Sequence, residues 1–342
     1  MINIYDIAEK AGVSAATVSR VINNSSIVKP KTAQKVLEII EKYGYVPSTT
    51  ARNLSKGSSM NIGFIVPDID NPFFSKILHG ISDRAAFYGY NVFMFGSDEN
   101  IEREHSILKS LSYDMLKGLL IIPVSNEDKN TASYLRTFES KGIPVVLIDR
   151  DINNYHFNGV FSEDEQGSYD AVSLLIDEGF KNIGIISGPT TSKPGSNRLK
   201  GYKRALKDAG IPIKDDYIVS GDFKLDKSYD AAKKLLEMPD PPKAIFTSNN
   251  LSTLGLLQYI NDKHLKIGRD IALIGFDDID YLNLLNINIT VVDRPIYNMG
   301  YQAMELLNNS FDKESEDDII KRILVKSWII KRGSEKMLIG EK

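Results

Sequence analysis

The sequence predicts an α/β protein in which a small helical head precedes a body of two lobes, each a parallel sheet with helices on both faces. Three observations support this fold class. The first part of the chain carries apolar residues at helical spacing, with glycines where helices should end. From Asn61 onward, short apolar runs of strand length alternate with helical segments, and this alternation occurs twice. With 342 residues the chain is also too long for one core, because domains mostly span ~100–200 residues.

The head begins with two short helices joined by a tight turn. Asn3 can cap a first helix over 4–11, whose apolar stripe consists of Ile4, Ile7, Ala8 and Ala11, and Gly12 ends this helix. Ser14 is a good N-cap for a second helix from Ala15 to about Asn23. Two short helices joined by a turn that contains glycine are typical of a helix-turn-helix unit.

A third helix completes the core of this unit. It starts at Pro30 or Thr32 and stops at Gly44. Its inward-facing residues are expected to be Ala33, Val36, Leu37 and Ile40. We therefore place a helix-turn-helix head over residues 1–47.

The second helix has one face to pack and one face to present. Its packing face carries Val18, Val21 and Ile22. The presented face carries Ala15, Ala16, Ser19, Arg20 and Asn23. Small alanines let the start of the helix enter the major groove and touch a thymine methyl, and an arginine can pair bidentately with guanine. The hydroxyl groups of Ser14, Thr17 and Ser19 can donate to phosphates. The alternative is a three-helix bundle that mediates protein contacts.

Charge is distributed unevenly along the chain. Residues 1–60 hold eight Lys and Arg against four acidic residues, whereas the remainder carries a net charge of −7 and the whole chain −3. A basic head on an acidic body is expected when only the head meets phosphates. This asymmetry favours double-stranded DNA as the partner of the head.

These motifs resemble the LacI/GalR family of bacterial repressors. The stretches IYDIAEKAGVSAATVSRVIN and KTAQKVLEIIEKYGYVPSTTARNLSKG are similar to the DNA-binding head of the family nearly throughout, and the resemblance extends to about Ser334. It implies a homodimer whose two heads read a near-palindromic operator, and an effector domain that resembles periplasmic sugar-binding proteins.

Residues 48–60 are expected to form a linker with a short hinge helix. Ser48 can cap a segment that runs through Lys56, and a helix this short is marginal in water, so we expect it to fold only on a partner surface. The family resemblance implies that two such segments lie in the minor groove, with Leu54 wedged between base pairs and Arg52 and Lys56 on phosphates. The alternative is that Leu54 packs against its own head.

The body should contain eight central strands in two similar halves. The apolar runs are NIGFIV, YNVFMF, KGLLII and PVVLID, followed by NIGIIS, YIVSG, KAIFTS and DIALIGF. Helices are expected over 73–88, 197–209 and 295–308, and a final strand pair over IIKRILV and WIIKR. The resemblance implies three crossings between the lobes, near Asn158, Asn288 and Ile319. The first lobe then comprises 61–158 with 292–318, and the second comprises 159–291 with 319–334.

Enzyme, metal and membrane signals are missing from the sequence. There is no dinucleotide-binding, P-loop or G-x-S-x-G motif, and the four histidines show no metal spacing. We therefore expect no catalytic residue, cofactor or metal site. No apolar run approaches the length of a membrane helix, the N-terminus lacks a secretory signal, and there is no cysteine, so a cytoplasmic location is the simplest expectation.

Polar and aromatic residues gather where strands of both halves end. Ligands of open α/β sheets bind at the carboxyl ends of strands, where carboxylates and guanidinium groups can grip hydroxyls while phenylalanine rings stack on a sugar. By resemblance, the sugar-binding positions are Asn71, Phe73, Phe74, Asp149, Arg150, Arg198, Asn249 and Asp277. The alternatives are that the phenylalanines are core residues, that Asp149 and Arg150 form a structural ion pair, and that Asp278 caps a helix.

Two departures from the family pattern concern the choice of ligand. Ile122 stands where ribose binders have an asparagine, and Asp293 stands where many family members have glutamine, which adds Asp293 to the effector-binding set. An anionic sugar acid is disfavoured unless Arg294 neutralises Asp293. The sequence thus predicts a sugar-responsive transcriptional regulator, most simply a dimeric repressor of carbohydrate genes. The alternatives are a sugar-binding protein without a DNA role and a cytosolic enzyme on the same scaffold.

Overall fold

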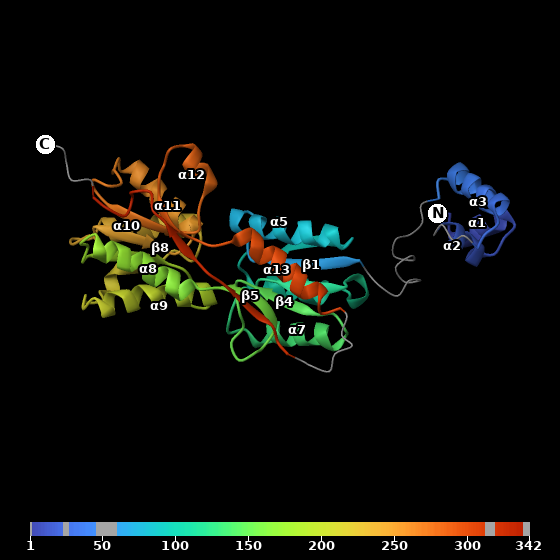
Figure 1. Ribbon diagram of the computed structural model, residues 1–342, viewed down its shortest axis with the longest axis horizontal. Helices are drawn as coiled ribbons and strands as arrows, with labels where there is room; N and C mark the ends of the chain where they lie inside the picture. The colour runs from blue at the N-terminus through green and yellow to red at the C-terminus, as the bar shows by residue number, and fades with distance from the viewer. Residues whose placement is uncertain (1, 23–26, 46–59, 312–318, 338–342) are drawn as a thin grey trace. The chain divides into compact units, whose positions relative to one another are not determined.

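The computed structural model describes residues 2–22, 27–45, 60–311 and 319–337 (Figure 1). The chain divides into two compact units, Met1–Met60 and Asn61–Lys342. We describe each unit by itself. No helix in the described ranges combines the length and the apolar character that crossing a membrane requires.

Within its described residues, 2–22 and 27–45, the head forms three helices with the predicted boundaries. It consists of α1 (Ile4–Ala11), α2 (Ala15–Ile22) and α3 (Pro30–Tyr43). The Asn3 side chain accepts from the backbone N–H of Asp6, and the Asp6 carboxylate accepts from the backbone N–H of Asn3, which completes a capping box. Gly12 ends α1 with a φ of 65°, a conformation that glycine adopts without steric cost.

The apolar core of the head confirms most of the expected inward-facing residues. The buried members are Ile7, Ala8, Ala11, Val18, Val21 and Val36. Leu37 is a correction, because the residue is 53% exposed. The buried stripe of α3 is centred on Val36, and residues advance by about 100° along a helix, so the next residue points to the flank.

The described part of the body, residues 61–311 and 319–337, contains two six-stranded sheets. The first has the order β11-β5-β4-β3-β1-β2 with all pairs parallel, and the second has the order β12-β10-β9-β8-β6-β7, in which β12 alone is antiparallel to its neighbour. The strands of the first sheet are β1 (Asn61–Val66), β2 (Asn91–Gly96), β3 (Gly118–Ile121), β4 (Val145–Ile148), β5 (Asn158–Ser162) and β11 (Arg322–Val325). Those of the second are β6 (Ile183–Ser187), β7 (Ile218–Ser220), β8 (Ala244–Thr247), β9 (Ala272–Phe276), β10 (Thr290–Asp293) and β12 (Trp328–Ile330).

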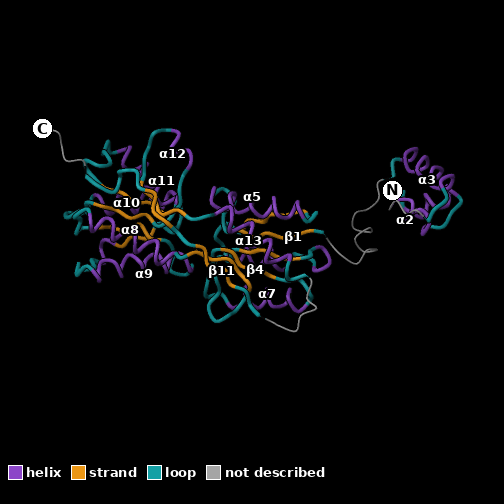
Figure 2. Tube along the Cα trace, in the orientation of Figure 1, coloured by secondary structure: helices purple, strands orange, loops and turns teal. Residues whose placement is uncertain are grey.

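Helices cover both faces of each sheet and bury an apolar core on each face (Figures 1 and 2). In the first lobe these helices are α5 (Pro72–Phe87), α6 (Ile101–Ser110), α7 (Lys129–Ser140) and α13 (Ile296–Asn308). In the second lobe they are α8 (Asp164–Asp177), α9 (Lys193–Asp208), α10 (Leu225–Leu236), α11 (Asn250–Asp262) and the short α12 (Asp280–Leu284). Each lobe is therefore a doubly wound sheet, as the alternation of strands and helices predicts.

Glycines allow paired helices to pack unusually close. A Cβ added at Gly80 in α5 would lie 2.0 Å from the carbonyl oxygen of Tyr297, and one at Gly300 in α13 would lie 2.1 Å from that of Ile77. Neither position has room for any side chain. The two helices thus approach backbone to backbone over the first sheet.

The chain crosses between the lobes slightly later than predicted. It leaves the first sheet after β5, returns between β10 and α13, and crosses a third time between β11 and β12. The crossings expected near Asn158, Asn288 and Ile319 were placed too early in the sequence. At these points β5, β10 and β11 have still to pair with their own sheets, over 158–162, 290–293 and 322–325. The last two strands therefore join different sheets and do not pair with each other. Helix α9 also begins earlier than the expected 197, because the Ser192 hydroxyl caps it by accepting from Gly195 N.

Candidate DNA-binding face and interlobe cleft

The presented face of α2 is arranged as the sequence predicts. Val18 and Val21 are buried, whereas Ala16 and Arg20 are exposed, and Ala15, Thr17 and Ser19 are partly exposed. The Ser14 hydroxyl accepts from the backbone N–H of Thr17 at 3.2 Å and bonds its hydroxyl at 2.9 Å, so Ser14 caps α2. Asn23, Arg52, Leu54 and Lys56 lie outside the described residues.

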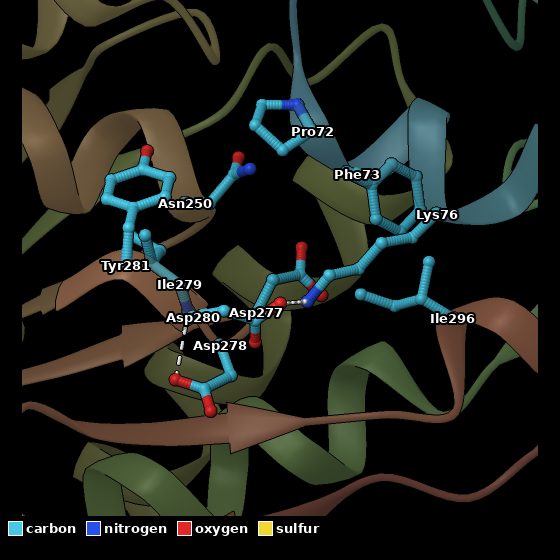
Figure 3. Close-up of a pocket in the computed structure, with 10 residues that line it drawn as sticks. All are labelled: Pro72, Phe73, Lys76, Asn250, Asp277, Asp278, Ile279, Asp280, Tyr281 and Ile296. Carbon is cyan, nitrogen blue, oxygen red and sulfur yellow. Dashed lines mark hydrogen bonds and ion pairs between the residues drawn. The ribbon is translucent and has the colours of Figure 1, made fainter. Parts of the chain in front are cut away.

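Most of the predicted effector-binding residues line one cavity between the two sheets. These are Asn71, Phe73, Phe74, Asp149, Arg150, Arg198, Asn249 and Asp277. Asn71 and Asn249 cap the N-termini of α5 and α11, where each side chain accepts from a backbone N–H. Asp149 and Asp277 directly follow β4 and β9. A neighbouring cavity shares Phe73, Asn250 and Asp277 with the first (Figure 3).

Asp293 was expected to line the effector cavity but lines neither of these two cavities. Its neighbour Arg294 lines the first cavity instead. Successive residues along a strand point to opposite sides. Arg294, one residue beyond β10, points into the cleft and is 3% exposed. Partial burial raises the pKa of Asp293, and the nearby Asp277 and Asp278 carboxylates raise it further.

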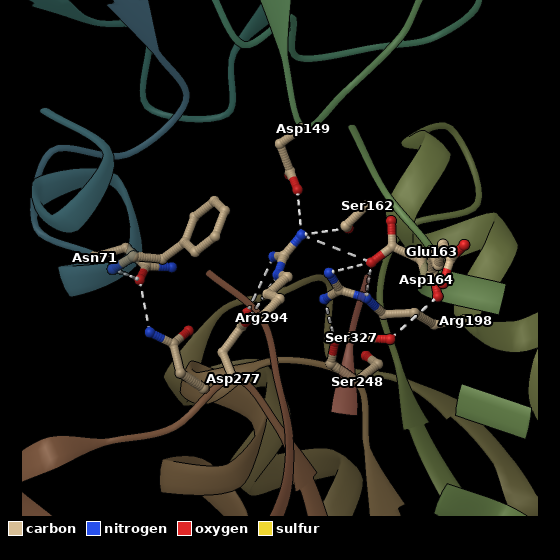
Figure 4. Close-up of polar contacts among 12 residues, drawn as sticks. Asn71, Asp149, Ser162, Glu163, Asp164, Arg198, Ser248, Asp277, Arg294 and Ser327 are labelled. Atoms are coloured by element: carbon tan, nitrogen blue, oxygen red, sulfur yellow. Dashed lines mark hydrogen bonds and ion pairs between the residues drawn. The ribbon is translucent and has the colours of Figure 1, made fainter. Parts of the chain in front are cut away.

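Arg294 is the centre of a buried ion-pair network (Figure 4). Its Nε and Nη2 donate to Asp277 at 2.7 and 3.2 Å, and its Nη1 donates to Asp149 at 2.5 Å and to the Ser162 hydroxyl at 2.8 Å. Burial alone would lower the pKa of Arg294, but Asp277, Asp149 and Asp164 together raise it well above its ordinary value. The guanidinium group therefore stays charged inside the cleft.

Two further arginines are held by carboxylates of their own lobes. Arg198 donates from Nε and Nη2 to Asp164 at 3.0 and 2.7 Å, and its guanidinium carbon lies 3.7 Å from the ring centre of Phe276. Arg150 forms a bidentate pair with Glu99 at 2.8 and 2.6 Å. It therefore does not form a structural ion pair with Asp149, which was the alternative to a sugar-binding role for these two residues. Two charge-assisted bonds from one guanidinium group fix the orientation of its plane.

Several residues around the cleft adopt a left-handed backbone that is uncommon outside glycine. Asp149 and Asp277 have φ values of 62° and 68°, and Glu99 and Phe223 have values of 51° and 59°. Such strain costs on the order of 1–3 kcal/mol per residue and clusters at functional sites. Here it turns side chains at strand ends toward one cavity.

Two expectations for individual residues are settled by their contacts. Asp278 does not cap α12 with its side chain; it forms a bidentate pair with Arg332 at 2.8 and 2.6 Å. Ile122 is fully buried and belongs to the same apolar cluster as Phe73 and Phe74. The two phenylalanines therefore contribute both to the core and to the cavity wall.

Sequence reasoning missed Glu99, Pro194, Phe223 and Arg294 as lining residues. A signal was present for two of them, because Glu99 and Phe223 follow the carboxyl ends of β2 and β7. The rule that ligands bind at strand carboxyl ends would have included both.

Comparison with known families decides the assignment. Residues 3–48 match the family described as bacterial regulatory proteins, lacI family, and residues 59–328 match periplasmic binding proteins and sugar binding domain of LacI family. The chain belongs to the LacI family. The predicted resemblance and the predicted fold class are thereby confirmed. As a LacI family member, it is a DNA-binding transcriptional regulator.

Individual relatives match over nearly the whole chain. Catabolite control protein A of Priestia megaterium is 37% identical over 324 residues, which are 94% of this chain and 96% of that protein. The crystal structure of the lac repressor dimer bound to operator and the anti-inducer ONPF has a TM-score of 0.79 at 25% identity and covers 98% of this chain and 99% of that one. A complex of the transcriptional regulator CelR with cellobiose has a TM-score of 0.71 at 26% identity and covers 98% of this chain and all of that one.

Proposed function

We propose that this LacI family protein is a dimeric repressor whose affinity for a near-palindromic operator is set by a small sugar, or a sugar derivative, bound between the lobes. The observation that carries the proposal is the cleft, where eight residues chosen from the sequence line one cavity at the carboxyl ends of both sheets. The relatives that bind cellobiose or carry the name ribose operon repressor support a carbohydrate ligand.

In the cleft, carboxylates and amides are the groups that bind hydroxyls, and aromatic rings are the surfaces that stack on a sugar ring. Asp149, Asp277 and Asn249 supply acceptors and donors, and Phe73 and Phe223 supply aromatic surface. We infer that the protein acts by binding alone and carries out no chemical conversion of the ligand, which is consistent with a family of regulators.

On DNA, the exposed face of α2 would enter the major groove. Arg20 would read a guanine, Ala15 and Ala16 would lie against base edges, and Ser14, Thr17 and Ser19 would contact phosphates. The linker residues Arg52, Leu54 and Lys56 are proposed to act in the minor groove, as the family resemblance implies.

Operator binding is tested by fluorescence anisotropy on genomic fragments from upstream of the gene, at several salt concentrations. We expect tight binding that weakens steeply with salt, because phosphate contacts release counterions. Arg20→Met should lose sequence preference. The control is Arg269→Met, which changes another exposed arginine that lies in the body and pairs with Asp270, and it should bind as the wild type does. No salt-sensitive binding to any fragment would favour a sugar-binding protein without a DNA role.

The ligand is tested by a thermal-shift screen of pentoses, hexoses, disaccharides and sugar acids, followed by calorimetry. A bound sugar should stabilise the body, because a ligand that binds only the folded state raises its melting temperature. Asp277→Asn should abolish this shift. Chromatography of the recovered ligand should show it unchanged, and a converted product would instead support an enzyme.

A further inference from the structure

Arg294 contacts carboxylates that belong to different lobes. Asp149 follows β4 of the first sheet and Asp277 follows β9 of the second, and the guanidinium group of Arg294 donates to both. Ser162, at the end of β5, accepts a further bond at 2.8 Å. Figure 4 shows the guanidinium group between these partners. One side chain at the second crossing thus joins the two sheets.

The two aspartates occupy equivalent places in the two lobes. Each follows the strand that lies beside a crossing strand, β4 beside β5 and β9 beside β10. Each has a left-handed φ, and each donates its backbone N–H to that neighbouring strand at 2.8 Å, Asp149 to Val160 and Asp277 to Val292. The same strained turn, used twice, directs one carboxylate from each lobe toward Arg294.

Bonds at the rim of the cleft also join the lobes. The Asn250 side chain donates to Asn71 at 2.8 Å, and Lys76 pairs with Asp280 at 2.7 Å (Figure 3). The backbone N–H of Asn126 donates to the carbonyl of Thr191 at 2.7 Å. The side chains of Lys76 and Asp280 are 36% and 69% exposed, so solvent screens their attraction. The bond between Asn250 and Asn71 is buried but joins neutral groups, whereas the Arg294 network is a buried contact between charged groups.

We propose that Arg294 is an interlobe strut that sets the spacing of the two lobes, and that an effector changes this spacing by competing for its partners Asp149 and Asp277. The proposal rests on the proposed function, because it assigns the regulation of the effector cleft to one residue. Without the guanidinium group, Asp149 and Asp277 would lose their ion pairs with Arg294, and Asp164 would keep its pair with Arg198. The like charges of the three carboxylates would then favour separation of the lobes.

Spacing can be measured with spin labels, because the chain contains no cysteine. Ser133→Cys in α7 and Lys200→Cys in α9 place one label on an exposed residue of each lobe. Electron–electron dipolar spectroscopy on the dialysed full chain should give a narrow distance distribution for the labelled parent. Arg294→Met should give a longer mean distance and a broader distribution.

Arg332→Met is the matched control, because Arg332 also forms a bidentate ion pair, with Asp278, but within the second lobe. We expect its distribution to match that of the parent. Should Arg294→Met fail to fold, as judged by circular dichroism, Arg294→Lys decides the matter: it keeps the charge but not the planar fork, and should broaden the distribution. Two results would contradict the proposal that Arg294 is an interlobe strut: a distance distribution that is already broad in the labelled parent, or a folded Arg294 variant whose distance distribution equals that of the parent.

Operator anisotropy on the same labelled samples separates this proposal from the proposed function. Loss of operator binding by the parent would contradict the proposed function. Retained operator binding together with an unchanged distance distribution in the folded Arg294 variants would contradict the strut alone.

Discussion

The pair formed by Arg198 and Asp164 should be among the most costly contacts of the body to break. Both side chains are almost fully buried, at 2% and 3% exposure, and two nitrogen atoms of Arg198 donate to one oxygen of Asp164. Arg198→Met keeps much of the apolar stem but leaves Asp164 with Arg294 as its nearest cation, 3.7 Å away. Removing one partner of a buried ion pair costs about 3–5 kcal/mol.

A neighbouring pair provides the matched control. Arg204 and Glu165 join the same two helices, α9 and α8, but their side chains are 38% and 39% exposed. Arg204→Met should therefore cost only about 0–1 kcal/mol, since solvent screens exposed pairs. The double variant Arg198→Met, Asp164→Asn should recover about half of the single loss, because no unpaired carboxylate then remains buried.

Urea unfolding measures these differences, and the single tryptophan, Trp328, in β12 reports on the lobe that contains the pair. Burial already raises the pKa of Asp164. In Arg198→Met the Asp164 carboxylate should take up a proton more readily. The loss of unfolding free energy should therefore shrink as the pH falls toward the pKa that Asp164 has in the unfolded chain. A loss within about 1 kcal/mol of the Arg204→Met control, or a double variant no more stable than the single one, would refute this account of the cleft.

Three other substitutions test separate parts of the structure. Leu54→Ala should weaken operator binding by a few kcal/mol in anisotropy and leave the ligand Kd unchanged in calorimetry, because a wedge acts only on DNA, and unchanged operator affinity would remove that role. Gly80→Ala should lower stability by about 1–3 kcal/mol in urea unfolding, because its Cβ would overlap the α13 backbone, whereas the exposed Ser75→Ala should not. Burial raises the pKa of Glu104. Its ionisation therefore destabilises the fold, progressively as the pH rises from the pKa of Glu104 in the unfolded chain through its pKa in the folded chain. Glu104→Gln should therefore melt higher than wild type at pH 7.5, with a difference that vanishes near about pH 4, and an equal difference at both pH values would contradict this reasoning.

Local signals in the sequence predicted local structure well. The cap at Asn3 and the stop at Gly12 gave the correct bounds for α1, because capping bonds span only a few residues. The strand ends likewise indicated Asp149 and Asp277, because parallel sheets bring carboxyl ends to one edge.

Features that depend on pairing with distant residues could not be predicted from local patterns. The first crossing comes after Ser162 because β5 pairs with β11, more than a hundred residues away. Asp278 forms its ion pair with Arg332, which is 54 residues away in the sequence, so this contact could not be predicted for the same reason. Whether Arg294 or Asp293 lines the cavity depends on which side of β10 faces the cleft. Because β10 is buried on both faces, its sequence does not alternate between apolar and polar residues and so does not show which side this is.

The central claim is that a ligand held between the lobes changes the affinity of the head for DNA. It is tested most directly by titrating a labelled operator, at one fixed salt concentration, with and without a saturating amount of the compound that stabilises the body most. We expect the operator Kd to change by about 5–150-fold, and the ligand Kd to change by the same factor when operator is bound, because coupling between sites is reciprocal. A ligand shown by calorimetry to occupy the cleft while leaving the operator Kd the same would contradict the account.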